Sequence, residues 1–172
     1  DKDGALLLAP GQEGYSVLGE LYADIRIIDD LNLYVGRKEF DTPFINRNDT
    51  RMTPNTFEAI TLQGRMGLGD NAGTLKYGVG YFDAIKERNS DEFVPMSVDA
   101  GATVDRGVFT AGGLYENGDF SIGAIDYYSP DIINIGYLEA KLAVPVCPDW
   151  KPRFAAQFTD QRAVGDEFVA NA

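Results

Sequence analysis

The side chains that could do chemistry in this sequence are basic residues gathered in and around one polar stretch, residues 40–56. Guanidinium groups suit bidentate contact with carboxylates, and a group of basic side chains favours anionic solutes by simple electrostatics. The candidate site residues are Arg37, Lys38, Arg47, Asp49, Arg51 and Arg65, with Lys141 much further along the chain. This composition favours the binding of small anions.

Bond-breaking chemistry is poorly supported by the same sequence. The chain has no histidine, which removes the commonest general base, the serine and cysteine triads and every histidine-containing metal site. Its single cysteine, Cys147, excludes an internal disulfide framework and a multi-cysteine metal centre. We therefore expect a protein that is not an enzyme and that uses no cofactor and no metal.

The basic residues also have a plainer interpretation. Arg37, Arg47 and Arg51 can form salt bridges with Asp41 and Asp49 and so fold the polar stretch and nothing more. Arg65 and Lys141 can be ordinary solvated side chains on the polar faces of their strands. Spacing alone leaves both interpretations open.

The net charge of the chain and the hydropathy of its sequence argue against a nucleic-acid partner and against a helical membrane segment. The formal net charge is −12, so nucleic acid is not an expected partner, because a phosphate binder needs a basic face. No apolar run is long enough for a transmembrane helix, and the polar start of the sequence does not resemble a signal peptide.

Apolar and polar residues alternate with a period of two along most of the chain, which predicts β-strands and no helix. The first predicted strand covers residues 15–27, and about eight strands follow one another as a meander. Tight turns such as Asn117-Gly118-Asp119 alternate with long loops over about 40–56 and 87–106. Long strands with short turns at one end and long loops at the other are typical of a membrane β-barrel.

The alternation is the same in a soluble barrel, so other features must separate the two classes. Charged residues and glycines in mid-strand favour a polar lumen over a packed core. Aromatic residues near strand ends suggest an interfacial girdle, and these are Tyr15, Tyr34, Phe57, Tyr127, Tyr128 and Tyr137. In a soluble protein Val17, Leu21, Ile25, Leu138 and Leu142 would instead point into one buried core.

Residues 36–58, GRKEFDTPFINRNDTRMTPNTFE, resemble the signature stretch of the OprD-type outer-membrane porins, the substrate-specific channels of Gram-negative bacteria. Three further segments resemble the same family in the same order: IKERNSD at 85–91 with Phe93, SIGAIDYY at 121–128, and AAQFTDQR at 155–162 with Val164-Gly165. The resemblance runs from about Gly19 to Gly165 and so covers most of the chain.

The resemblance implies an all-β fold, an antiparallel transmembrane β-barrel of up-and-down topology. About eight strands of an eighteen-stranded barrel are present, with loops that fold inward and narrow the pore. It implies a bacterial outer-membrane porin that passively conducts small, carboxylate-bearing solutes through a pore lined by the basic residues named above. The expected partners are these solutes and outer-membrane lipid.

The length departs from this pattern, because members of the family are more than twice as long as this chain. We therefore expect one barrel segment over residues 1–172, a portion of a larger porin. A chain that pairs with further strands, its own or another's, is a second interpretation. The alternatives are a small eight-stranded barrel with an anchoring or adhesive role, which requires the first strand to pair with the last, and a soluble β-barrel that binds a ligand.

Overall fold

The structure is a computed structural model that describes residues 14, 16–48, 53–88, 90–147 and 150–166. Its described residues form a single antiparallel sheet with one short helical turn. The elements are β1 (Leu21–Ile28), β2 (Leu31–Lys38), β3 (Thr56–Gly67), β4 (Thr74–Lys86), β5 (Val94–Pro95), α1 (Met96–Asp99), β6 (Val108–Asn117), β7 (Phe120–Ser129), β8 (Ile133–Ala143) and β9 (Arg153–Ala163). In the described part of the chain no helix is both apolar and long enough to cross a bilayer.

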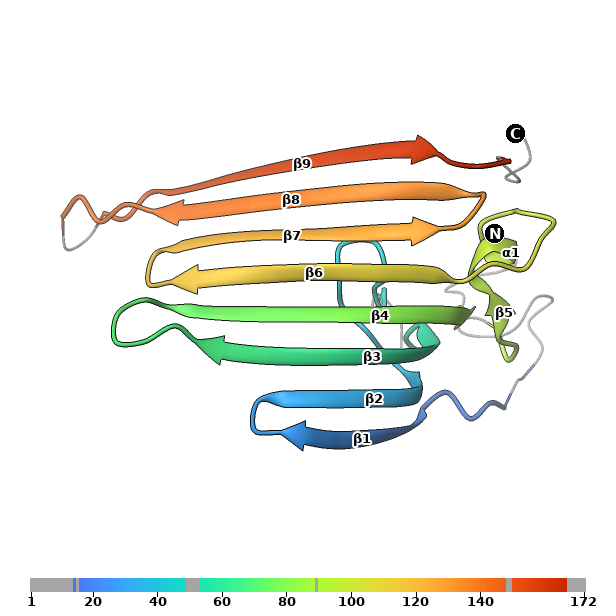
Figure 1. Cartoon of the computed structure of the whole chain (residues 1–172). Helices are drawn as coiled ribbons and strands as arrows, with labels where there is room; N and C mark the ends of the chain where they lie inside the picture. Colours follow the sequence, from blue (N-terminus) through green and yellow to red (C-terminus); the bar gives the residue numbers. More distant parts are fainter. Residues whose placement is uncertain (1–13, 15, 49–52, 89, 148–149, 167–172) are drawn as a thin grey trace.

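The strands follow one another in space as they do in sequence, which confirms the predicted meander. The order is β1-β2-β3-β4-β6-β7-β8-β9, and the two-residue strand β5 adds to β4 (Figure 1). Residues with positive φ make the tight connections: Asp30 joins β1 to β2, and Gly118 joins β6 to β7. Both residue types tolerate this conformation, which is why the hairpins close where the sequence predicts them.

Two details of the predicted elements are wrong. The first strand begins at Leu21, and residues 16–20 lie outside it, while Tyr15 is outside the described residues. The long loop between β4 and β6 contains β5 and the single turn α1, although no helix is expected from the sequence. The alternation of apolar and polar side chains therefore predicts a first strand that begins too early, because the alternation does not show where pairing with the next strand begins.

The sheet stays open. Among the described residues β1 pairs only with β2, and β9 only with β8, so the first and last strands are both edges. Closure of an eight-stranded barrel, which the anchoring alternative requires, does not occur. The described part of the chain is therefore an open antiparallel sheet with two free edges.

Strand register separates the sheet into two faces. One row of paired residues runs Ile25, Leu33, Leu62, Val79 and Ala111 across five strands, and we call this side the apolar face. The opposite side carries Thr61, Gln63 and Arg65 on β3 and Lys76 on β4. We call that side the tongue face, because a loop lies across it.

The apolar face is uncovered, which excludes the soluble alternative. Leu21, Ile25, Leu138 and Leu142 are between 42% and 66% exposed, so the residues that should fill a soluble core do not enter one. Phe154 and Phe158 on β9 are more than 60% exposed on the same face. This apolar surface requires a nonaqueous environment or a partner.

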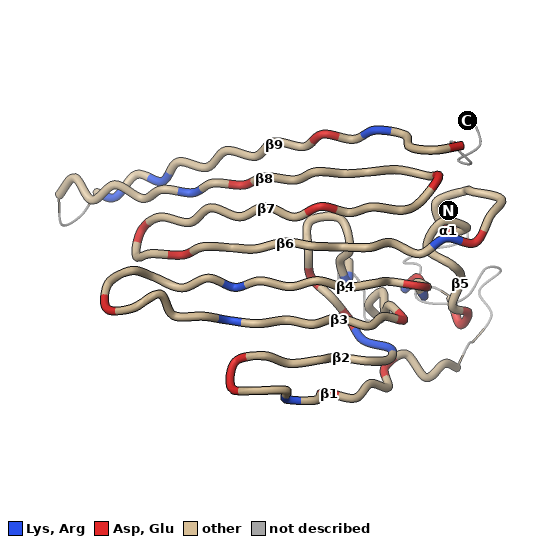
Figure 2. Tube along the Cα trace, in the orientation of Figure 1, with Lys and Arg blue, Asp and Glu red and all other residues tan. Residues whose placement is uncertain are grey.

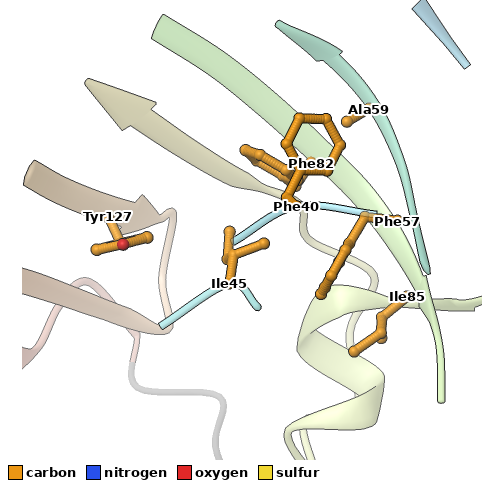
Figure 3. Close-up of a cluster of buried hydrophobic side chains, with 7 residues drawn as sticks. All are labelled: Phe40, Ile45, Phe57, Ala59, Phe82, Ile85 and Tyr127. Atoms are coloured by element: carbon orange, nitrogen blue, oxygen red, sulfur yellow. The ribbon is translucent and has the colours of Figure 1, made fainter. Parts of the chain in front are cut away.

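The tongue, defined as residues 39–47, begins the connection from β2 to β3 and folds across the sheet behind β4 and β6 (Figure 1). The buried hydrophobic cluster of the described residues lies where the tongue meets the sheet (Figure 3). Its members are Phe40 and Ile45 of the tongue with Phe57, Ala59, Phe82, Ile85 and Tyr127 of the strands. The ring centroids of Phe40 and Phe82 are 4.9 Å apart in an edge-to-face arrangement.

Phe57→Ala tests whether this cluster holds the fold. Phe57 is only 2% exposed, so its truncation leaves a cavity, and we expect a loss of about 3–5 kcal/mol in the free energy of unfolding. The measurement is equilibrium denaturation of the protein in detergent micelles. Phe154→Ala, at a site that is 61% exposed on the apolar face, is the matched control and is expected to change stability far less. An equal loss in both variants contradicts a core centred on the tongue.

Candidate functional site

A groove of about 750 Å³ lies beside the tongue on the tongue face of the sheet. The tongue contributes Asp41, Thr42 and Pro43 to one side of it. The sheet contributes Arg65, Lys76, Gly112, Tyr137 and Glu139. The groove thus combines a wall formed by the tongue with a charged wall formed by the strands.

Two of the predicted site residues line this groove, Lys38 and Arg65. The ammonium group of Lys38 lies 4.1 Å from the ring centre of Tyr34 and 5.1 Å from that of Tyr22, an arrangement typical of cation–π contact. Arg65 is exposed, and its guanidinium makes no hydrogen bond or salt bridge with the residues that the structure describes. Arg65 is therefore a cation available to a solute in the groove.

The other predicted basic residues have partners within the protein. The Nε atom of Arg37 lies 3.2 Å from Glu58, and its guanidinium stacks 4.2 Å from the ring centre of Phe93. Alternation along β2 places Arg37 on the side opposite Lys38. Arg47 lies 3.7 Å from Glu39 and 4.0 Å from Asp41, which is the loop-folding arrangement that the sequence left open.

Lys141 is also neutralised locally. Its ammonium lies 2.6 Å from Glu139, and the same carboxylate accepts hydrogen bonds from Gln157 at 2.8 Å and from Tyr137 at 3.2 Å. Asp49 and Arg51, the remaining predicted site residues, lie outside the described residues.

Several groove residues were not predicted as site residues. Lys76 pairs in register with Arg65, and its ammonium is 2.6 Å from Glu116. Strand alternation could have placed Lys76 and Glu139 on the polar face, but nothing in the sequence shows that the tongue lies beside them. Which strand residues border the groove depends on how the long loop folds.

The predicted aromatic girdle is only partly correct. Tyr128 is 42% exposed on the apolar face, as a girdle residue would be. Phe57 and Tyr127, however, are only 2% exposed and belong to the buried cluster beneath the tongue. Tyr34 contacts Lys38 and Tyr137 lines the groove, so both lie on the tongue face; Tyr15 is outside the described residues.

A second buried group ties the far end of the tongue connection to the sheet. The side chain of Lys86 has no exposure, and its ammonium donates to the carbonyl oxygens of Glu87, at 3.0 Å, and Pro54, at 3.4 Å. Asn55 accepts a hydrogen bond from the backbone N–H of Arg88 at 2.8 Å. The loop is thus fixed at the point where it re-enters β3.

Solved outer-membrane porins share this fold. OccAB3 of Acinetobacter baumannii is 19% identical with a TM-score of 0.73, over 87% of this chain and 37% of that protein. OpdK of Pseudomonas aeruginosa is 22% identical with a TM-score of 0.73, over 87% and 39%. OccK9 (OpdG) of the same organism is 21% identical with a TM-score of 0.73, over 85% and 37%.

These likenesses confirm the predicted fold class, because the open antiparallel sheet has the fold of part of a porin β-barrel. The chain spans less than two fifths of the length of each of these porins. Searches with family models and against curated proteins found no match.

The ring contacts of Lys38 can be tested directly by NMR. Because the ammonium lies over the face of Tyr34, ring current should shift the Lys38 ε-methylene protons upfield of ordinary lysine values. Tyr34→Leu should return them to those values, whereas Tyr128→Leu, which removes a tyrosine from the other face, should leave them shifted. Ordinary lysine shifts in the unmodified protein would contradict the contact.

Proposed function

We propose that this chain forms part of the wall of an OprD-type porin in the bacterial outer membrane and that it lets small carboxylate-bearing solutes pass without catalysis. The observation that carries the proposal is the tongue, which lies across the charged face of an open barrel segment and leaves a groove with unpaired basic groups beside it. The fold of solved porins supports the same conclusion.

In this proposal the apolar face contacts lipid and the tongue face contacts water. Aromatic pairs lie at both ends of the apolar face, as in the girdles of membrane barrels. Tyr81 and Phe109, near the long loops, have ring centres 4.8 Å apart, and Tyr115 and Phe120, near the short turns, are 6.3 Å apart. The residues between them, such as Val79, form the apolar band.

The open edges imply further strands. An unpaired backbone N–H or C=O costs several kcal/mol in hydrocarbon, so β1 and β9 cannot both remain edges in a bilayer. We infer that additional strands, of the same or another chain, pair with both and close the barrel. The partial coverage of the solved porins supports this inference.

The charges of the groove favour anions. Acidic partners neutralise Lys76 and Lys141, whereas Arg65 and Lys38 have no acidic partner among the described residues. A guanidinium in this position offers bidentate contact to a carboxylate, while several moderate contacts in series still permit release. OpdK has been solved with vanillate, an aromatic carboxylate, which is consistent with this class of solute.

Single-channel recording of the reconstituted chain in planar bilayers tests the proposal, with Arg65→Gln as the informative variant. Removal of this charge should reduce the preference for anions, measured from the reversal potential in a salt gradient, by about two- to fivefold. Lys141→Met combined with Glu139→Gln is the matched control, because it removes that lysine together with the carboxylate that neutralises it at 2.6 Å. Absence of conductance in the unmodified chain would contradict conduction by this chain, and equal effects of the two variants would remove Arg65 from the selectivity.

The lipid contact of the apolar face has its own test. Leu62→Arg places a charge on the apolar face, whereas Gln63→Arg places the same side chain on the tongue face one residue away. In lipid vesicles the first should lower the free energy of unfolding by about 2–4 kcal/mol, because arginine is costly near the bilayer midplane. The second should lower it much less, and a reversed order of the two variants would show that the faces are assigned the wrong way round.

A further inference from the structure

We propose that Tyr127 is a positioning residue that latches the tip of the tongue to the sheet. Its hydroxyl and that of Thr42 form the latch, and together they hold residues 42–44 against β7 and so set the width of the groove. The consequence for solute passage rests on the proposed function, but the latch itself does not.

Each of the two latch hydroxyls donates a hydrogen bond and accepts one from a backbone N–H. The Tyr127 hydroxyl donates to Thr42 Oγ1 at 2.9 Å and accepts from the backbone N–H of Phe44 at 3.3 Å. The Thr42 hydroxyl in turn donates to the carbonyl oxygen of Ile45 at 2.8 Å and accepts from the Ile45 N–H at 3.2 Å. Each hydroxyl proton has one acceptor, so the network fits one arrangement.

The hydrogen bonds of the Tyr127 hydroxyl matter for stability because this hydroxyl is buried. Tyr127 is only 2% exposed, and a buried hydroxyl without a partner is unfavourable by about 1–3 kcal/mol. Phenylalanine would fill the same apolar space without that requirement. The Tyr127 hydroxyl therefore has hydrogen-bond partners only while the tongue lies in its observed position. The position of the tongue is thus coupled to a single oxygen atom on β7.

The tip depends on Tyr127 for its polar contact with the sheet. Within the described residues, the hydrogen bonds that join positions 42–44 to the strands both end on the Tyr127 hydroxyl. The Phe44 ring adds edge-to-face contacts, with ring centres 5.5 Å from Tyr127 and 6.1 Å from Tyr137. Phe44 nevertheless remains 39% exposed, so these contacts alone leave the tip partly in solvent.

The root of the tongue is held by different interactions. Phe40 and Ile45 pack in the buried cluster (Figure 3). Arg47 forms salt bridges with Glu39 and Asp41. Loss of the latch should therefore release the tip while the root stays packed. Thr42 and Pro43 border the groove, so movement of the tip changes the cross-section available to a solute.

The experiment is residue-resolved hydrogen exchange on the full chain in detergent micelles. In Tyr127→Phe and in Thr42→Val we expect the amide of Thr42 to exchange about tenfold faster, while amides in the middle of β4 and β6 are unchanged. This amide bonds to the carbonyl oxygen of Ile45 within the tongue, an acceptor that both variants keep, so its exchange reports opening of the tip and not loss of its acceptor. Thr42→Ser keeps the hydroxyl and should restore slow exchange.

Tyr128→Phe is the matched control, because it removes the same hydroxyl one residue away on the apolar face. Unchanged tongue exchange in both Tyr127→Phe and Thr42→Val overturns the latch. Faster exchange throughout the sheet also overturns it, because that result assigns Tyr127 to general stability.

Bilayer recording separates this proposal from the proposed function. If the unmodified chain conducts, Tyr127→Phe should give larger and noisier currents, and unchanged currents would show that the latch does not set the pore width. If the unmodified chain does not conduct, the porin proposal fails for this chain, and the exchange experiment still decides whether the latch exists.

Discussion

The packing of the tongue against β3 and β4 is the interaction on which the rest of this structure depends. Phe40 and Ile45 reach back onto Phe57 and Phe82 and make the buried cluster of the described residues, on the polar side of the sheet. Because burial occurs there, the apolar residues of the opposite face remain uncovered. The tongue thus determines which face of the sheet is covered and where the groove forms.

The sheet itself could be predicted from the sequence, and the tongue could not. Alternation of side chains is local, so it reveals strands such as β3 and β4 and the residues that share a face. The connection from Tyr127 to Thr42 spans 85 positions, and no periodicity reports such a contact. For the same reason Phe57 and Tyr127 were expected in an aromatic girdle: their spacing is that of strand-end aromatics, and only the folded loop shows that they are covered.

Electrostatic pairing distinguishes the predicted site residues from one another. Residue type identifies Arg37, Arg47 and Lys141 as cations, but the nearest carboxylate decides whether such a charge is felt by a solute. Glu58 lies on the strand paired with β2, Asp41 lies within the tongue, and Glu139 is two positions from Lys141 on one strand face. The pair of Lys141 with Glu139 can be predicted from their two-residue spacing along one strand. The pair of Arg37 with Glu58 can be predicted only when the register of β2 and β3 is known.

A net charge of −12 for the whole chain is compatible with the proposed preference of the groove for anions, because only charges close to the groove act on a solute there. Many acidic residues lie near the two ends of the sheet (Figure 2), and Asp29, Asp30 and Asp119 lie in tight turns between strands. Water and ions screen such exposed charges over about 8–10 Å, so they contribute little field in mid-strand. Of the charged residues that line the groove, Lys76 is matched by Glu116 and Glu139 by Lys141, each at 2.6 Å, whereas Arg65 and Lys38 have no acidic partner among the described residues. In the proposed porin, selectivity would therefore be governed by the cations beside the tongue that have no acidic partner among the described residues, and the net charge of the whole chain would contribute little to it.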